Sequence, residues 1–187
     1  METGANTTIE PNPVHFANDF NLAVQAQLPG VVVPQKIYVP PRPGGHNPTR
    51  LSRLMFSSSN GLPGVRVQDV INGTVDVLNA TTTPTLSETG VRVTLRICWP
   101  GYPEWTKNNA VVLQSNNQPP RNLGDITAQI ATAIETFYKE MRTVPEETLG
   151  DTSGWELSKI PFESLYLVEI RPVLQASWQP VICVDIA

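Results

Sequence analysis

The chain has 187 residues, a length that fits one domain of ordinary size with a sizeable hydrophobic core. Its formal net charge is -4 at pH 7, so the broad basic surface that binds nucleic-acid phosphates is not expected. No run of about 18 apolar residues occurs, and the first residues lack the charged and apolar regions of a secretory signal. We therefore expect a cytoplasmic or nuclear protein with no membrane partner, and nucleic acid is an unlikely one.

Residues 1–50 read as an extended, proline-rich arm that is partly disordered or lies over the domain. Within it, the run VVVPQKIYVPPRP combines β-branched residues with a polyproline-like stretch. This run could lie along a sheet edge of its own chain. It could also offer the segment Pro40-Pro41-Arg42-Pro43 to an aromatic groove on a partner. An arm that follows the surface of its own domain is the simpler interpretation.

A single α+β domain is predicted over residues 51–187. The run LSRLMF at its start predicts a short strand, and the Ser-, Gly- and Pro-rich stretch that follows predicts a loop. Apolar residues at near-helical spacing from Val67 to Leu78 predict a helix, which Gly73 weakens. The residues from Thr81 to Gly90 then read as a second loop.

The clearest strand pattern runs from Val91 to Trp99, where successive residues alternate between an apolar and a largely polar face. Pro100 and Gly101 end this strand. A second strand at Ala110–Ser115 is expected to pair with it in antiparallel fashion. The expected buried face consists of Val91, Val93, Leu95, Ile97 and Trp99.

The stretch from Asn122 to Met141 has the strongest helical pattern in the chain. Its apolar residues fall at spacings of three or four and form one stripe, and Asn122 or Asp125 can cap its start. The polar, turn-rich stretch Thr143–Ser158 that follows predicts a mobile surface loop. We expect the helix to pack against Val93, Leu95 and Ile97 of the strand through Ile126, Ile130, Ile134 and Phe137.

Two β-rich runs, Val168–Val173 and Val181–Ile186, close the chain. The residues between them, 174–180, predict a hairpin with a wide or bulged connection that contains Trp178. Pro172 is expected at an edge or a bulge, because proline cannot donate a hydrogen bond to a central ladder.

Together these elements predict an α+β fold. Short links between strands favour antiparallel pairing, so we expect an antiparallel or mixed sheet of about four to five strands. One long amphipathic helix and a shorter helix are expected to cover the sheet. The Pro-rich N-terminal arm is expected to be extended.

Three sequence elements, RVTLRICWPGYPEW, DITAQIATAIETF and LYLVEIRPVLQASWQP, resemble a family of uncharacterised proteins that is abundant in mushroom-forming basidiomycete fungi. The resemblance covers residues 61–184. It includes a WPGY..W element, which ends at Trp105, and an SWQP element, Ser177–Pro180. The resemblance implies a fungal, intracellular origin and carries over no activity and no catalytic residue.

No complete catalytic, nucleotide-binding or metal-binding motif occurs in the chain. The two cysteines, Cys98 and Cys183, read as reduced thiols. A dyad of Cys98 with His46 is formally possible, but a cysteine on a strand is more commonly a packing residue. We therefore expect no catalytic residue, no metal and no cofactor.

The best candidate for a partner-binding site is an aromatic corner. Tyr102 and Trp105 follow the Pro-Gly turn, where rigid aromatic side chains can anchor a partner, and Trp178 can join them from its own turn region. The alternative is that these rings cap an open end of the sheet.

These observations predict a non-enzymatic intracellular protein-interaction module that binds a protein partner, including a second copy of itself, through a strand edge or the aromatic corner. Two alternatives stay open. One is a small enzyme, which a histidine and a carboxylate within hydrogen-bond reach of Cys98 would favour. The other is a structural or capsid-like assembly subunit with an exchangeable arm, which a large native mass would favour.

Overall fold

The computed structural model describes residues 27–39, 53–86, 91–115, 118–145, 148–152, 154–174 and 176–185. Over these residues the chain forms an α+β fold with one 7-stranded mixed sheet and the helices α2 (Val67–Asn72) and α3 (Leu123–Met141). A short 3-10 helix, η4, spans Phe162–Ser164. The strands are β1 (Val31–Val32), β2 (Leu54–Met55), β3 (Val65–Arg66), β4 (Arg92–Ile97), β5 (Trp105–Val112), β6 (Leu165–Leu174) and β7 (Ser177–Val184).

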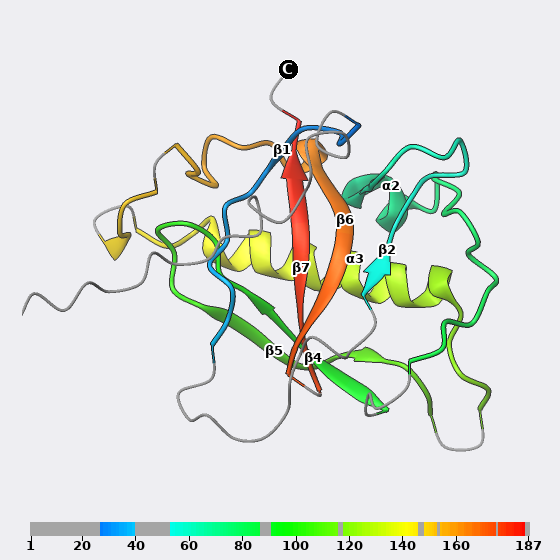
Figure 1. The fold of residues 1–187 in the computed structure, drawn as a ribbon. Helices are drawn as coiled ribbons and strands as arrows, with labels where there is room; N and C mark the ends of the chain where they lie inside the picture. Colours follow the sequence, from blue (N-terminus) through cyan, green and yellow to red (C-terminus); the bar gives the residue numbers. More distant parts are fainter. Residues whose placement is uncertain are drawn as a thin grey trace, which may run out of the picture.

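The sheet has the order β2-β6-β7-β4-β5, with β1 paired to β7 and β3 paired to β6 (Figure 1). The predicted α+β class is confirmed, but the sheet contains more strands than expected. Sequence analysis missed β3 and gave pairing of the run that contains β1 only as one of two possibilities; both strands have only two residues. A period of two needs several residues to be visible, so such short strands leave no pattern in the sequence.

The centre of the sheet is the antiparallel hairpin of β6 and β7, and every residue of β7 is buried. The wide connection predicted over residues 174–180 is wrong, because β7 already begins at Ser177. A strand buried on both faces shows no alternation of apolar and polar residues, which hid the first half of β7. The ladder shifts register between Pro172 and Leu174, in agreement with the expected bulge.

Strand β4 runs parallel to β7 and antiparallel to β5. Its predicted apolar face is confirmed, since Val93, Leu95, Ile97 and Trp99 are all buried. Val91 is 57% exposed, so the expectation that it belongs to this face is wrong. The strand begins only after it, at Arg92.

Helix α3 covers one face of the sheet and crosses behind β6 and β7 in Figure 1. The helix begins after Asn122, whose side-chain oxygen accepts a hydrogen bond from the backbone N–H of Asp125 at 2.8 Å. The predicted core is confirmed, because the apolar stripe of α3 and the inward face of β4 belong to one buried cluster that contains Ile126, Ile130, Ile134, Phe137, Val93, Leu95 and Ile97.

Helix α2 is shorter than the helix predicted over 67–78. Gly73 adopts a left-handed conformation with φ of 66°, and its N–H donates to the carbonyl of Val70 at 3.2 Å. A glycine in this conformation is a common helix end. Leu78 then lies against Ser57, with its N–H donating to the Ser57 carbonyl at 2.8 Å.

The arm residues 31–35 fill a gap in the sheet next to β7. Strands β4 and β7 pair only near the start of β7, and β1 pairs with the end of β7. Between these pairings, the fully buried side chain of Gln35 accepts from the N–H of Cys98 at 3.1 Å and donates to the carbonyl of Pro180 at 2.8 Å. The N–H of Val33 donates to the carbonyl of Ile182 at 2.9 Å. This part of the arm therefore pairs with the sheet of its own chain, beside the interior strand β7.

At Gly30 the arm backbone lies so close to the backbone of β7 that a side chain would not fit between them. A Cβ atom at this position would lie 2.2 Å from the carbonyl oxygen of Val184. The arm as a whole is not described: residues 1–26 and 40–52, which include the segment Pro40-Pro41-Arg42-Pro43, lie outside the described residues. The division into an arm and a domain at residue 51 stays a prediction.

Truncating Gln35 to Ala is expected to loosen the arm. The change leaves the N–H of Cys98 and the carbonyl of Pro180 without their buried partner, at a cost of about 1–3 kcal/mol. Hydrogen exchange should then accelerate at the amides of Val33 and Cys98. The control is Gln68→Ala, whose side chain lies on α2 and donates to Asn72 at the surface. Equal exchange in both variants would show that Gln35 does not hold the arm.

Candidate functional site

An open groove of about 840 Å³ lies where three segments meet: the arm, the turn after β4, and a loop between α3 and β6. These segments are far apart in the sequence. The side chains and backbone that line the groove belong to Pro34, Lys36, Ile37, Tyr38, Val39, Cys98, Trp99, Pro100, Gly101, Tyr102, Glu104, Gly150, Asp151 and Trp155.

Gly101 allows the turn after β4 to pack directly on the loop. Its φ is 79°, and a Cβ atom there would lie 2.6 Å from Cγ2 and 2.9 Å from Cα of Thr152. Its carbonyl accepts a hydrogen bond from the N–H of Gly150 at 2.8 Å. Glycine adopts positive φ without the strain that a side chain adds, so both requirements favour glycine at this position.

Two aromatic side chains of the same turn hold the loop in place. The indole N–H of Trp99 donates to the carbonyl of Trp155 at 2.7 Å, and the hydroxyl of Tyr102 accepts from the N–H of Leu157 at 3.0 Å. The side chain of Leu157 is fully buried. The expectation of a surface loop throughout residues 143–158 is therefore wrong at this end, because the WPGY element supplies an anchor that the loop sequence does not reveal.

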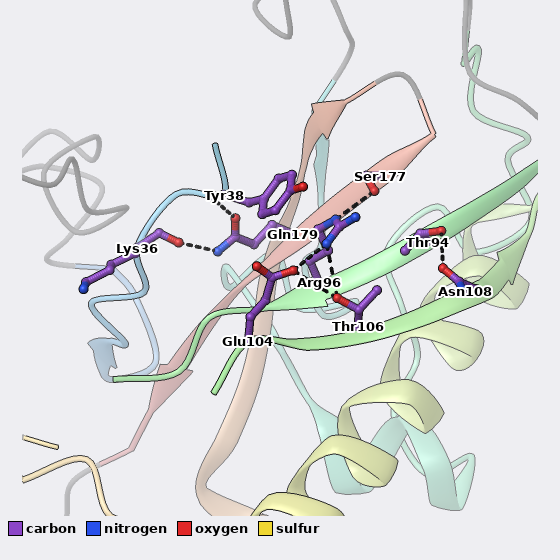
Figure 2. Close-up of polar contacts among 9 residues, drawn as sticks. All are labelled: Lys36, Tyr38, Thr94, Arg96, Glu104, Thr106, Asn108, Ser177 and Gln179. Atoms are coloured by element: carbon purple, nitrogen blue, oxygen red, sulfur yellow. Dashed lines mark hydrogen bonds and ion pairs between the residues drawn. The ribbon is translucent and has the colours of Figure 1, made fainter. Parts of the chain in front are cut away.

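The guanidinium of Arg96 organises the polar side of the site, as Figure 2 shows. It forms an ion pair with Glu104, donates to Thr106 at 3.2 Å, and donates through Nε to the hydroxyl of Ser177 at 3.1 Å. The ring of Tyr38 lies over the guanidinium, with 4.0 Å between Cζ and the ring centroid. This distance is typical of a cation–π contact, and the contact holds the Tyr38 ring on one of its faces.

The buried side chain of Gln179 holds the arm backbone at the groove (Figure 2). Its Nε2 donates to the carbonyl of Lys36 at 2.8 Å, and its Oε1 accepts from the N–H of Tyr38 at 3.0 Å. Because both bonds use the arm backbone, they set where the side chains of Lys36 and Tyr38 emerge. Gln179 belongs to the SWQP element.

Of the predicted aromatic corner, the structure places Tyr102 in the groove but neither Trp105 nor Trp178. Trp105 is 7% exposed, and its indole N–H donates to the carboxylate of Glu140 on α3 at 2.6 Å. Its ring packs edge-on against Phe137, with 5.7 Å between centroids. Trp178 is 1% exposed.

The expectation that these two tryptophan rings are open to a partner is therefore wrong. Strands β5 and β7 begin earlier than predicted, at Trp105 and Ser177, and place both indoles in the hydrophobic core cluster that also contains the apolar stripe of α3. Both rings are core residues, and nothing in their surroundings shows whether they cap an open end of the sheet, as the alternative expects. The predicted partner-binding segment Pro40–Pro43 lies outside the described residues.

Sequence reasoning missed the residues that build the groove. Arg96 appeared only as one polar position on the outer face of its strand, and Gln35 and Gln179 gave no indication of burial. A buried glutamine is recognisable only by its partners, which here lie far away in the sequence. The sequence elements that included part of the site were WPGY and SWQP.

Burial keeps both cysteine thiols protonated. It raises the pKa of Cys98 to about 11, with a further contribution from the Glu104 carboxylate, and it raises the pKa of Cys183 to about 12. The thiolate is the reactive form of cysteine. Cys98 lines the groove, but it is therefore not an activated nucleophile, and His46, its formal dyad partner, lies outside the described residues.

We expect both thiols to resist alkylation in the folded protein. At pH 8, iodoacetamide should react roughly 100-fold more slowly with Cys98 in the folded protein than with the thiols of the denatured chain. The thiols of the denatured chain have the ordinary pKa of about 8.5, so a larger fraction of them is thiolate. A pKa raised by folding stabilises the protein only while the thiol stays protonated, so stability should fall as pH rises from about 9 through 11.

Mass spectrometry of the alkylated protein measures the reaction at each cysteine, and denaturant titration at several pH values measures the stability. Replacing both cysteines with Ala should leave the oligomeric state the same in oxidising and reducing buffers. Rapid labelling of Cys98, or a disulfide-linked dimer on a non-reducing gel, would contradict the expectation.

Among the residues that the structure describes, no group of three or more His, Cys, Asp and Glu side chains is placed to hold a metal ion. The helices of this described part are also too short or too polar to cross a membrane. No protein-family model, curated protein or solved structure matches the chain.

Proposed function

We propose that the protein is a non-enzymatic protein-interaction module that binds an extended segment of a partner polypeptide in the groove. The observation that carries the proposal is that, besides the buried Trp99, three partly exposed aromatic side chains line the groove and are each held by contacts within the protein. Rigid aromatic residues provide a large contact area at a low cost in conformational entropy, which makes them effective anchors for partners. They are Tyr38, Tyr102 and Trp155.

The three rings are held in different ways. Tyr38 is fixed by the Arg96 guanidinium and by its backbone bond to Gln179. The Tyr102 hydroxyl accepts a backbone hydrogen bond. Trp155 packs edge-on against Trp99, with ring centroids 6.3 Å apart and planes at 82°. A partner would therefore meet a surface that needs little rearrangement.

The alternative of a strand edge has less support. The exposed edge of the sheet at β5 is interrupted by a register shift opposite Val93 and Leu95, and Asn109 has a positive φ of 53°. The side chain of Gln129 on α3 forms hydrogen bonds with both backbone groups of Val112. It accepts from the N–H at 2.7 Å and donates to the carbonyl at 3.2 Å. Bulges and covered backbone groups protect sheet edges from pairing with other chains.

The enzyme alternative also has less support, because the thiol that lines the groove is protonated at neutral pH. The intracellular location, cytoplasmic or nuclear, and the relationship to the fungal family are part of this proposal. The third alternative, a structural or capsid-like assembly subunit, requires that copies of the protein associate with one another.

A displayed library of random peptides tests the proposal. It would be panned on the wild-type protein, on Val39→Lys in the groove, and on Leu62→Lys as a control. Val39 and Leu62 are 78% and 59% exposed, so neither change should disturb folding, and only Val39 lines the groove. We expect peptides that bind the wild type and Leu62→Lys at least tenfold better than Val39→Lys. Absence of enrichment, or equal binding to all three proteins, would refute the proposal.

A further inference from the structure

We infer that the groove binds a proline-rich segment that carries an arginine, and that its occupant is the segment Pro40-Pro41-Arg42-Pro43 of a second copy of this chain. The inference rests on the proposed function of the groove and names its ligand. It also gives the arm a role in self-association.

The walls of the groove suit a polyproline helix. Such a segment is extended before it binds, so it loses little entropy, and its recognition depends on grooves lined with aromatic side chains. This groove offers the rings of Tyr38, Tyr102 and Trp155, together with the proline rings of Pro34 and Pro100. Its volume of about 840 Å³ leaves room for several residues.

An exposed carboxylate at the groove suits a cation in the occupant. Glu104 and Asp151 contribute two carboxylates, and Lys36 and the Arg96 guanidinium beside the groove contribute two cations, so the charges balance and the cation would be bound by Glu104 itself. Glu104 already pairs with Arg96, but its side chain is 40% exposed and keeps a face toward solvent. A carboxylate can accept more than one charge-assisted hydrogen bond, so Glu104 can bind a second guanidinium. Arg42 supplies that group within a proline-rich context.

The sequence favours a second copy over the same chain as the source of the segment. Residues 36–39 line the groove themselves, so the residues that follow would have to reverse direction at once to enter it. Val39 and Pro40 each precede a proline, which disfavours the α region at both positions, and proline itself fixes φ. A tight reversal after Val39 is therefore disfavoured, whereas a segment from another molecule approaches without this constraint.

A mixing experiment tests the inference on full-length chains. The triple variant Pro40→Ala, Pro41→Ala, Pro43→Ala removes the ligand and keeps the groove, and Glu104→Lys impairs the groove and keeps the ligand. Light scattering over a range of concentrations should show self-association of the wild type, and at least tenfold weaker self-association of each variant alone. An equimolar mixture of the two variants should form a complex, because one contributes a groove and the other a segment.

Two controls make the outcome interpretable. Glu163→Lys reverses an exposed charge away from the groove and should associate like the wild type. If circular dichroism shows that Glu104→Lys is unfolded, Glu104→Gln takes its place. A synthetic peptide of residues 38–45 should also dissociate the wild-type complex, and the same peptide with Arg42→Ala should be at least tenfold weaker.

The possible failures are distinguishable. A wild-type chain that stays monomeric at every concentration, or variants that do not form a complex when mixed, would overturn the inference. If library peptides without proline bind the groove in that case, the proposed function still stands. If no library peptide binds the groove either, both proposals fail.

Discussion

Truncating Phe137 to Ala is expected to lower the free energy of unfolding by about 3–5 kcal/mol. The side chain is fully buried, and its ring centroid lies 5.7 Å from that of Trp99 and 5.7 Å from that of Trp105. Removing the ring deletes buried apolar surface and leaves a cavity bordered by two large, hydrogen-bonded indoles that cannot easily move to fill it. Urea titration followed by circular dichroism measures the loss.

Phe162→Ala is the matched control. Its ring contacts Tyr138 at 5.1 Å between centroids, but the side chain is only partly buried, so a smaller loss is expected. A loss below about 1 kcal/mol for Phe137→Ala would mean that α3 does not form the principal core contact with the sheet.

The Phe137 variant also probes the groove. Trp99 packs on Phe137 and holds the loop at Trp155 through its indole N–H. Loosening this indole should therefore increase hydrogen exchange at the amide of Leu157, which donates to Tyr102. The core under α3 and the shape of the groove are connected through Trp99.

Replacing Glu169 with Leu is expected to cost about 3–5 kcal/mol, because the change breaks a buried ion pair. The side chains of Glu169 and Arg171 are 2% and 6% exposed, and Arg171 donates to the two carboxylate oxygens at 2.9 and 3.0 Å. Arg53 approaches the same carboxylate at 3.7 Å. Without Glu169, the guanidinium of Arg171 stays buried and loses the two hydrogen bonds that the Glu169 carboxylate accepts.

A double variant separates the contribution of the ion pair to stability from the cost of leaving Arg171 buried without Glu169. Glu169→Leu with Arg171→Met removes both charges, and a buried ion pair replaced by apolar side chains is commonly near neutral in stability. We expect the double variant to be more stable than Glu169→Leu alone in the same urea titration. A double variant less stable than the single one would show that Arg171 stabilises the fold mainly through other contacts.

The sequence by itself determined the elements whose pattern is local. The span and the buried stripe of α3 follow from a period near 3.6, and the inward face of β4 follows from a period of two. The sequence offers Asn122 or Asp125 as the cap of α3, and the structure shows that Asn122 has this role. The turn that contains Tyr102 is also recognisable in the sequence, because Pro100 and Gly101 mark the end of the strand. These features depend on neighbours within a few residues, which a single sequence displays.

Tertiary structure alone decided how the arm, the turn and the loop form a groove. Gln35 and Gln179 bind backbone groups more than 100 residues away along the chain, and Trp105 and Trp178 are buried in a core cluster that combines residues of α3 with residues of several strands. Hydrogen bonds and burial of this kind depend on which distant segments meet, and no local period encodes that pairing. The residue types at the site were therefore visible in the sequence, but their roles as core, clamp or groove wall depended on contacts between segments far apart in the chain.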